Sequence, residues 1–277
     1  MVFNIGAHVS ISGGPRKAVE KQAALGGNCG QIFAGSPRTW KVSSYDSQDN
    51  EEFEDAREEN NQGIYVIHST YLVNLATPKD DLFEKSLNCL QSEIDAARDL
   101  GIEYVVFHPG AHTGSGVDNG IERIGSGIDK LDIHDDVTLL LENTAGKGTT
   151  IGKSMEQLNR ILENCETNKN VGVCIDTCHA HAAGYDLEND IDSLVTEIKN
   201  TFGLELLDVL HLNDSKDELG SEKDNHDHIG EGNIGDEGFR NVVNHEDLRD
   251  LPMVLETPVD DHKGYAENVE KLKALRN

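Results

Sequence analysis

The sequence predicts a (β/α)8 TIM barrel, and three features of the chain support this prediction. The chain has 277 residues, enough for one large domain or two small ones. It contains eight short apolar, β-rich runs, each followed by a polar stretch of helical character. From His68 to His211 the polar residues that end these runs recur at steps of 40, 34, 34 and 35 residues, the length of one β/α unit. We therefore expect an α/β protein whose residues 1–277 form a single barrel domain.

Taken in chain order, the expected strands are short runs rich in β-branched, aliphatic and aromatic residues. They are Phe3–His8, Cys29–Phe33, Ile64–His68, Tyr104–His108, Val137–Glu142, Val171–Asp176, Leu207–His211 and Pro252–Glu256. A doubly wound open sheet is the alternative architecture, but such a sheet would not usually need eight strands at such even spacing. The spacing therefore favours the barrel.

Apart from the first expected strand, which ends in His8, six of the expected strands end in a titratable residue: His68, His108, Glu142, Asp176, His211 and Glu256. In a barrel the carboxyl ends of all strands meet at one face, where barrel active sites are built. Any one of these residues alone is explained by a hydrogen-bonded buried side chain or by a helix cap. Six together would form a costly cluster of buried polar groups unless something binds them. A bound metal ion would offset this cost.

Two further segments add ligand candidates. His179 follows Asp176 by three residues, and Asp224 and His226 form an Asp-x-His pair. The pair lies in a long loop, at about residues 215–238, and a loop of that length in a compact domain is usually functional or disordered. Imidazole and carboxylate ligands without thiolate are typical of zinc or manganese in catalytic use. Nine candidates exceed the needs of one or two ions, so three ions fit better.

The charge of the chain is strongly negative. It carries 51 acidic and 24 Lys or Arg residues, a net charge of −27. We interpret the acids as a solvated coat suited to a salt-filled cytoplasm, where self-repulsion is screened over about 3 Å at 1 M salt. Such a halophilic composition does not identify the reaction. On charge alone a nucleic-acid partner would be disfavoured, since such proteins usually carry a basic footprint.

The start of the chain and its cysteines bear on where the protein works. The first residues lack a basic start followed by an apolar stretch, and no later run approaches the roughly 20 apolar residues of a membrane span. We therefore expect a soluble cytoplasmic protein. The five cysteines form no Cys-x-x-Cys pair, which argues against a disulfide framework and a thiolate zinc finger. We expect them to be reduced and mostly buried.

Four longer motifs surround the ligand candidates: Leu141-Glu142-Asn143-Thr144-Ala145-Gly146, Asp176-Thr177-Cys178-His179, His211-Leu212-Asn213-Asp214 and Asp224-Asn225-His226-Asp227-His228-Ile229-Gly230-Glu231-Gly232. Together they resemble the endonuclease IV family of apurinic/apyrimidinic (AP) endonucleases. The similarity extends from Gly6-Ala7-His8-Val9-Ser10 to Leu255-Glu256-Thr257-Pro258. His181, where the family is expected to have an aromatic residue, and the additional His228 are departures at supporting positions. His8 lies near the site in the family but is not expected to be a ligand.

The resemblance implies a centre of three zinc ions, with manganese possible at one of them. The ligands divide as follows: His68, His108 and Glu142 on one ion; Glu142, Asp176, His211 and Glu256 on the second; and His179, Asp224 and His226 on the third. Three such ions can polarise a phosphodiester, generate hydroxide from a bridging water and neutralise the departing 3′ oxygen. Glu142, as the bridge, and Glu256, which would also orient the hydroxide, are the implied catalytic residues.

The resemblance also implies the substrate and its recognition. The reaction is hydrolysis of the backbone 5′ of an abasic site in duplex DNA, leaving a 3′-hydroxyl, by a protein expected to be a monomer without membrane contact. Arg38, Tyr71 and Leu72 match the positions that the family inserts into DNA. Trp40 is expected to pack inside. Seven basic residues near strand ends would offset the acidic coat on this face: Arg16, Lys17, Arg38, Lys41, Lys147, Lys153 and Lys216.

Two other functions remain open from the residues. A metal-dependent sugar isomerase or epimerase on a similar barrel would also place His, Asp and Glu at these strand ends, although it would need fewer ligands. A protein that only buffers metal or binds DNA is the non-enzymatic alternative. The Asp224 and His226 pair and the Arg38 and Tyr71 loops favour the nuclease.

Overall fold

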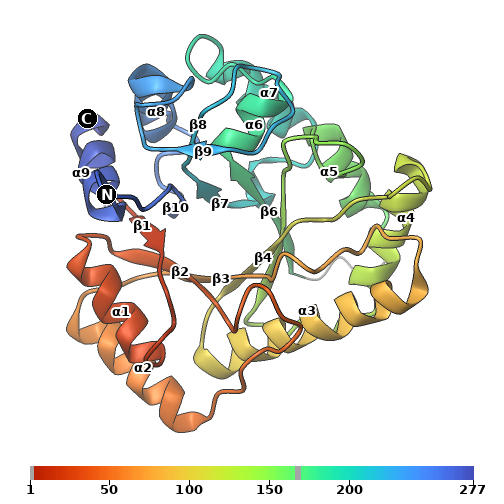
Figure 1. Cartoon of the computed structure of the whole chain (residues 1–277), viewed down its shortest axis with the longest axis horizontal. Helices are drawn as coiled ribbons and strands as arrows, with labels where there is room; N and C mark the ends of the chain where they lie inside the picture. Colours follow the sequence, from red (N-terminus) through yellow and green to blue (C-terminus); the bar gives the residue numbers. More distant parts are fainter. Residues whose placement is uncertain (1–2, 166–169) are drawn as a thin grey trace.

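A closed barrel of parallel strands forms the centre of the molecule, and helices surround it (Figure 1). The structure is a computed structural model that describes residues 3–165 and 170–277. Around the barrel the strand order is β1-β10-β7-β6-β5-β4-β3-β2, so the sheet closes on itself. The predicted TIM barrel is confirmed, and the open-sheet alternative is wrong because each of the eight barrel strands, all within the described residues, pairs with a neighbour on both sides.

All eight predicted runs form barrel strands: β1 (Ile5–His8), β2 (Cys29–Phe33), β3 (Tyr65–His68), β4 (Tyr104–Phe107), β5 (Thr138–Glu142), β6 (Val171–Asp176), β7 (Leu207–His211) and β10 (Met253–Leu255). The bounds differ from the predicted ones by at most two residues, and His108 and Glu256 lie one residue beyond their strands. Two short strands were not predicted. β8 (Asp214–Ser215) and β9 (His226–Asp227) pair antiparallel outside the barrel and hold together the long loop that contains Asp224.

The helices follow the strands in the expected alternation. They are α1 (Pro15–Ala24), α2 (Ser47–Glu59), α3 (Asp80–Leu100), α4 (Val117–Ile128), α5 (Met155–Glu163), α6 (Thr177–Ala183), α7 (Ile191–Asn200), the short 3-10 helix η1 (Leu204–Leu206), α8 (Gly235–Asn244) and α9 (Tyr265–Leu275). Local sequence sets several ends: the Asp46 carboxylate accepts from two backbone N–H groups at the start of α2, and Gly101, at φ 68°, ends α3. Among the described residues, no helix is both long and apolar enough to cross a membrane.

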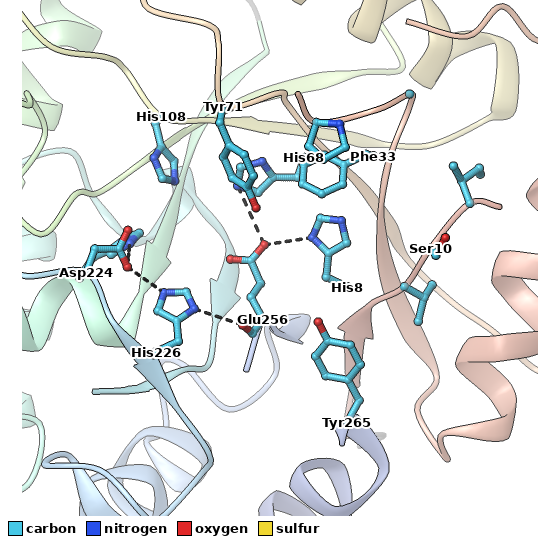
Figure 2. A pocket seen from close by; sticks show the side chains of 15 residues that line it. His8, Ser10, Phe33, His68, Tyr71, His108, Asp224, His226, Glu256 and Tyr265 are labelled. Atoms are coloured by element: carbon cyan, nitrogen blue, oxygen red, sulfur yellow. Dashed lines mark hydrogen bonds and ion pairs between the residues drawn. The ribbon is translucent and has the colours of Figure 1, made fainter. Parts of the chain in front are cut away.

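The alternation of side chains along each strand positions the functional site. A small cluster fills the barrel interior: Val66, Val106, Leu140, Cys174 and Val209. Each of these residues lies two positions before one of the predicted ligands, and side chains two apart in a strand share a face. The ligands on these five strands therefore form the next layer of the interior, at the mouth. Figure 2 shows His8, His68 and Glu256 directed into the same pocket at that mouth.

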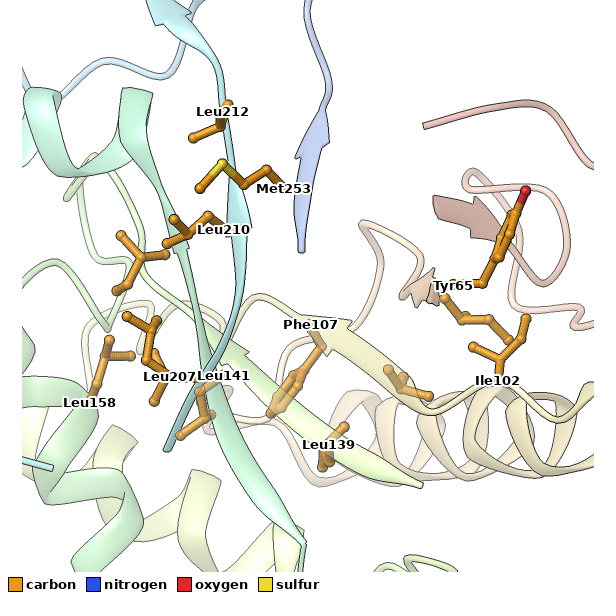
Figure 3. Packing of buried hydrophobic residues seen from close by; sticks show 14 of the residues in the cluster. Tyr65, Ile102, Phe107, Leu139, Leu141, Leu158, Leu207, Leu210, Leu212 and Met253 are labelled. Atoms are coloured by element: carbon orange, nitrogen blue, oxygen red, sulfur yellow. The ribbon is translucent and has the colours of Figure 1, made fainter. Parts of the chain in front are cut away.

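The main hydrophobic core lies on the other face of the strands. Phe107, Leu139 and Leu141 are fully buried there and belong to the large cluster that joins the barrel to its helices (Figure 3). Their neighbours Val106 and Leu140 point inward instead. Apolar packing on both faces thus fixes the strands, and a rigid barrel supports the polar layer at the mouth.

Candidate metal centre

Six of the nine predicted ligands line a cavity of about 530 Å³ at the mouth of the barrel: His68, His108, His179, Asp224, His226 and Glu256. His8, Phe33, Tyr71 and Tyr265 form part of the wall, together with several of the ligand candidates (Figure 2). The cavity opens on the face where the carboxyl ends of the strands converge, as the sequence predicted. Its polar groups come from loops and strands that are far apart in the sequence.

Glu142 occupies the centre of this cluster. Its side chain is fully buried. The Oε2 atom lies 2.9 Å from Nε2 of His108 and 3.2 Å from Nε2 of His68. The Oε1 atom lies 3.0 Å from Nδ1 of His211 and 3.6 Å from Nδ1 of His179. One carboxylate thus faces four imidazoles, two on each oxygen.

A second group of side chains gathers around Asp224, which comes from the long loop. Its Oδ1 atom lies 3.2 Å from Nε2 of His179 and 3.1 Å from Nε2 of His226. The buried Asp176 lies 3.9 Å from both imidazoles. Cys178 has its Sγ within reach of Asp224 and His226, although the sequence suggested no thiolate ligand. Burial raises the pKa of the Cys178 thiol, which keeps it protonated.

Glu256 completes the cluster. Its Oε1 atom lies 3.1 Å from Nδ1 of His8, and its Oε2 atom lies 3.5 Å from Nδ1 of His211. All nine predicted ligand positions therefore belong to one network of contacts: His68, His108, Glu142, Asp176, His179, His211, Asp224, His226 and Glu256.

Opposite charges dominate the protonation of the cluster. Burial disfavours the charged form of each group, but neighbours of opposite charge outweigh it. The pKa of Glu142 is held well below its usual range by His108 and His211, and that of Glu256 is lowered by His211 and by the hydrogen bond to His8. Conversely, hydrogen bonds and charges of the carboxylates raise the pKa of His68 and of His226 to about 9. Without metal, protons therefore supply the positive charge that the carboxylates require.

The orientation of the imidazoles fits a cation between them and the carboxylates. His68 donates Nδ1–H to the Ser69 carbonyl at 2.7 Å, and His179 donates Nδ1–H to the Asn143 carbonyl at 2.9 Å. Their Nε2 atoms therefore face carboxylates. Nε2 of His226 is buried and lacks a hydrogen-bond partner among the described residues, although Asp224 is 3.1 Å away. A neutral imidazole would direct a lone pair at an anion here, so a proton or a metal ion must lie between them.

Two asparagines in the motifs hold the carboxylates in place. Asn143 accepts from the backbone N–H of Asp176 at 2.6 Å. Asn213 donates to the Asp176 carboxylate at 2.6 Å and accepts from the backbone N–H of Glu256 at 2.8 Å. The Asp176 side chain also caps α6, the helix that carries His179. The motifs thus supply the supports of the site as well as its candidate ligands.

Three supporting residues were missed by the sequence analysis. Gln31 is fully buried and contacts both Glu256 and His211. Glu93, on α3, accepts from the backbone N–H of Thr70 at 2.9 Å, and burial raises its pKa to about 7. Thr70 in turn donates its hydroxyl to the Pro37 carbonyl at 2.6 Å. A polar Gln within an otherwise apolar strand was the one available signal, whereas the contacts of Thr70 and Glu93 depend on the tertiary fold.

The residues predicted to enter DNA lie beside the cavity on two loops that Thr70 joins. Arg38 is exposed and Tyr71 is 67% exposed, with its ring edge-on to Phe33, whereas Leu72 is only half exposed. The expectation that Trp40 packs inside is wrong, since it is 37% exposed on the Arg38 loop. That loop projects from the barrel, so its side chains meet solvent.

The predicted basic residues divide into two sets. Arg16, Lys17 and Lys153 form ion pairs with carboxylates, which cancels much of their attraction for an anion. The other four are exposed, and none has a carboxylate within ion-pair distance in the part of the chain described: Arg38, Lys41, Lys147 and Lys216. Only this second set can offset the acidic coat near the cavity.

The additional histidines and the cysteines lie outside the cluster of candidate ligands, except for Cys178. His181 is buried with Nε2 unpartnered among the described residues, and His228 contacts Asp260 at 3.1 Å. All five cysteines are free and buried, as predicted. Through its contact with Asp260, His228 connects the long loop to the loop after β10.

Comparisons with known proteins agree with this fold and identify its relatives. The family model described as a xylose isomerase-like TIM barrel matches residues 19–275. A probable endonuclease 4 of the halophilic archaeon Haloarcula marismortui is 50% identical over 99% of both chains. Endonuclease IV of Thermus thermophilus has a similar structure, with a TM-score of 0.88 and 37% identity over 98% of both chains. A D-tagatose 3-epimerase-like protein, at 21% identity and a TM-score of 0.72, shares the fold alone.

The raised pKa values predict how the metal-free protein responds to pH. The pKa of His68 and of His226 is about 9 in the fold and 6.5 ordinarily. Their stabilisation is therefore complete below pH 6.5 and is lost as the pH rises through about 9. We expect the melting temperature of chelated protein in molar KCl to fall by on the order of 5 °C between pH 6.5 and 9.5. Added zinc should largely remove this fall, and a flat pH profile of the chelated protein would contradict the assigned protonation.

Proposed function

This chain belongs to the endonuclease IV family of xylose isomerase-like TIM barrels, and we propose that it hydrolyses the backbone of duplex DNA 5′ of abasic sites, leaving a 3′-hydroxyl. It would thus act in base excision repair, as a monomer of one domain in the cytoplasm. The observation that carries the proposal is the buried Glu142 carboxylate, which faces four imidazoles beside an open cavity. Such a cluster requires cations, and the cavity leaves room for a substrate.

We assign the nine clustered residues as the ligands of three zinc ions, with manganese possible at one position. When bound, these ions would polarise the phosphodiester and lower the pKa of the attacking water. Glu142 suits a bridging role because Oε2 faces His68 and His108, whereas Oε1 faces His211 and His179. Asp224, His179 and His226 form the outermost group, and Asp224 is 44% exposed. Its exposure supports the proposal that substrate enters on this side of the cluster.

The chain's own residues would orient the attacking water and keep other water away from part of the cavity wall. Glu256 is the catalytic carboxylate best placed to orient the attacking water, since its side chain is 16% exposed beside the cavity and its pKa is lowered. A carboxylate that remains ionised can accept a proton from water in the transition state. Phe33 and Tyr71 form an apolar part of the wall, which lowers the local dielectric and strengthens these interactions.

Recognition of the lesion is assigned to the two loops at the mouth. Tyr71 and Leu72 follow the ligand His68 by three and four residues, so a side chain inserted into the duplex would lie close to the catalytic centre. Arg38 would contact the backbone or a groove from the neighbouring loop. Duplex DNA with an abasic site suits this arrangement because the missing base leaves a gap and lowers the cost of extruding the sugar.

The sugar isomerase alternative shares the fold and the use of metal. Its relatives among solved structures are only distantly similar to this chain in sequence, whereas the identity to endonuclease 4 extends over the full chain. The exposed Tyr71 beside the cavity also suits a duplex better than a small sugar. A protein that only stores metal has no need for a 530 Å³ cavity beside its ligands.

Cleavage of a defined duplex tests the proposed reaction. In molar KCl, which screens the net charge of −27, pure protein should nick a duplex with one abasic site on the 5′ side of the lesion. The upstream fragment should be extended by a DNA polymerase, because it ends in a 3′-hydroxyl. Chelation should abolish the cut and zinc should restore it, with an undamaged duplex as control. Sugar isomerisation without cleavage by the same preparation would overturn the assignment.

The number of ions is a separate prediction. Elemental analysis of fully active protein should give about three divalent ions per chain, mainly zinc with some manganese, because nine ligands exceed the needs of two sites. Protein that is fully active with one ion per chain would contradict the three-ion assignment. It would favour the isomerase instead.

Substitutions should separate chemistry from recognition. Glu142→Ala should abolish cleavage and lower the metal content, because both of its oxygens face candidate ligands. Arg38→Ala and Tyr71→Ala should retain the metal but weaken binding to abasic duplex about tenfold or more, since insertion or stacking contributes about 1–3 kcal/mol. Lys85→Ala, an exposed cation on α3, is the control. Parent-like binding by both loop variants would refute their role in recognition.

A further inference from the structure

One candidate ligand differs from the other histidines in the direction of its ring. His68, His179 and His226 each place Nδ1 against a main-chain carbonyl, at 2.7, 2.9 and 3.2 Å. A carbonyl only accepts, so Nδ1 carries the hydrogen and Nε2 faces the cluster. His211 has the reverse arrangement. Its Nδ1 atom faces Glu142 Oε1 at 3.0 Å and Glu256 Oε2 at 3.5 Å, while Nε2 points away from them.

The partner of His211 on that outer side is a side chain instead of a carbonyl. Nε2 of His211 lies 2.9 Å from Oε1 of Gln31, and both residues are fully buried. Gln31 belongs to β2 and His211 to β7, and His211 follows Gln31 by 180 residues in the chain. The hydrogen bond therefore connects strands that are not neighbours in the barrel order.

Glu256 determines which end of the Gln31 amide faces His211. Nε2 of Gln31 lies 2.6 Å from Oε1 of Glu256 and 2.9 Å from Nδ1 of His8. A carboxylate that binds a divalent cation can only accept, so the amide must present its NH2 group to Glu256. A flipped amide would place two oxygens against each other in a buried site. Oε1 of Gln31 is therefore left for His211, and because it only accepts, Nε2 of His211 must donate.

We propose that Gln31 is a positioning residue of the metal centre. It holds His211 with the hydrogen on Nε2, which leaves the Nδ1 lone pair for a divalent cation between Glu142 and Glu256, and the same amide holds the Glu256 carboxylate. The role rests on the proposed function only in requiring that the cluster binds divalent metal. Substitution of a side chain that orients a metal ligand in this way typically lowers the metal affinity about 10–100-fold.

The chain offers a matched control for a substitution at this position. Gln22, on α1, is also a fully buried glutamine, but it accepts from the backbone N–H of Ala7 and, within the described part of the chain, forms no hydrogen bond with a candidate ligand. Methionine is close to glutamine in shape and removes the hydrogen bonds. Gln31→Met and Gln22→Met therefore remove the same groups from a buried site, and only the former disconnects His211 and Glu256.

Competition for zinc with a chromogenic chelator tests the proposal without recourse to activity. Gln31→Met should lower the affinity for one bound ion about 10–100-fold, while Gln22→Met should bind zinc as the parent does. Equal affinity of Gln31→Met and the parent would overturn the role of Gln31 and leave the proposed function intact. A parent that binds no zinc would overturn the proposed metal centre as well.

Nitrogen NMR of the imidazole rings supplies a test that does not depend on a variant folding. In the zinc-loaded parent, His211 should carry its hydrogen on Nε2, whereas His68, His179 and His226 should carry it on Nδ1. The His211 signals can be assigned by their absence from a His211→Asn protein. A hydrogen on Nδ1 of His211 in the zinc-loaded parent would overturn the proposal.

Discussion

Four carboxylates gather at the barrel mouth, and the need to balance their negative charge governs the structure around them. Glu142 and Asp176 are fully buried, and burial of unpaired anions is too costly for a fold to sustain. The five imidazoles of the candidate ligands face them, with His8 as a sixth beside Glu256, so the positive charge must come from protons on the imidazoles or from metal ions. The direction of the imidazoles and carboxylates is then fixed by backbone carbonyls and by the side chains of Asn143, Asn213 and Gln31. This network is held because the strands beneath it are packed on both faces.

The sequence predicted the barrel and the cluster through the same periodicity. Strand side chains alternate, so an apolar interior residue such as Leu140 implies that Glu142, two positions later, points into the barrel as well. Gln31 could not be assigned in this way, because its role depends on His211 and Glu256, 180 and 225 residues further along the chain. The β8–β9 pair and the link from Thr70 to Pro37 were missed for the same reason: nothing in their local sequence encodes the partner.

The acidic coat and a DNA substrate are compatible for a local reason. Of the seven basic residues predicted for this face, three are paired with carboxylates, and four have no such pair among the residues described. At molar salt the repulsion between the coat and phosphates extends only about 3 Å. In the proposed function, binding would then depend on short-range terms, namely cations in the cavity, an inserted side chain and a few free basic groups. The bulk charge of −27 therefore indicates the working solvent, whereas the substrate is indicated by the cavity.

The residues proposed for recognition lie close to those proposed for chemistry, which has a consequence for selectivity. Tyr71 follows His68 by three residues, its ring is 6.0 Å from that imidazole, and Thr70 between them holds the Arg38 loop through the Pro37 carbonyl. The buried Glu93 carboxylate anchors the Thr70 backbone from α3. In the proposed reaction, a duplex that admits Tyr71 would thereby be held in a fixed position relative to the candidate ligands, without a large movement of the protein. Because misplacement of reacting groups by about 1 Å can lower a rate by about 100-fold, rigid coupling of this kind would allow the enzyme to reject intact DNA at the catalytic step as well as in binding.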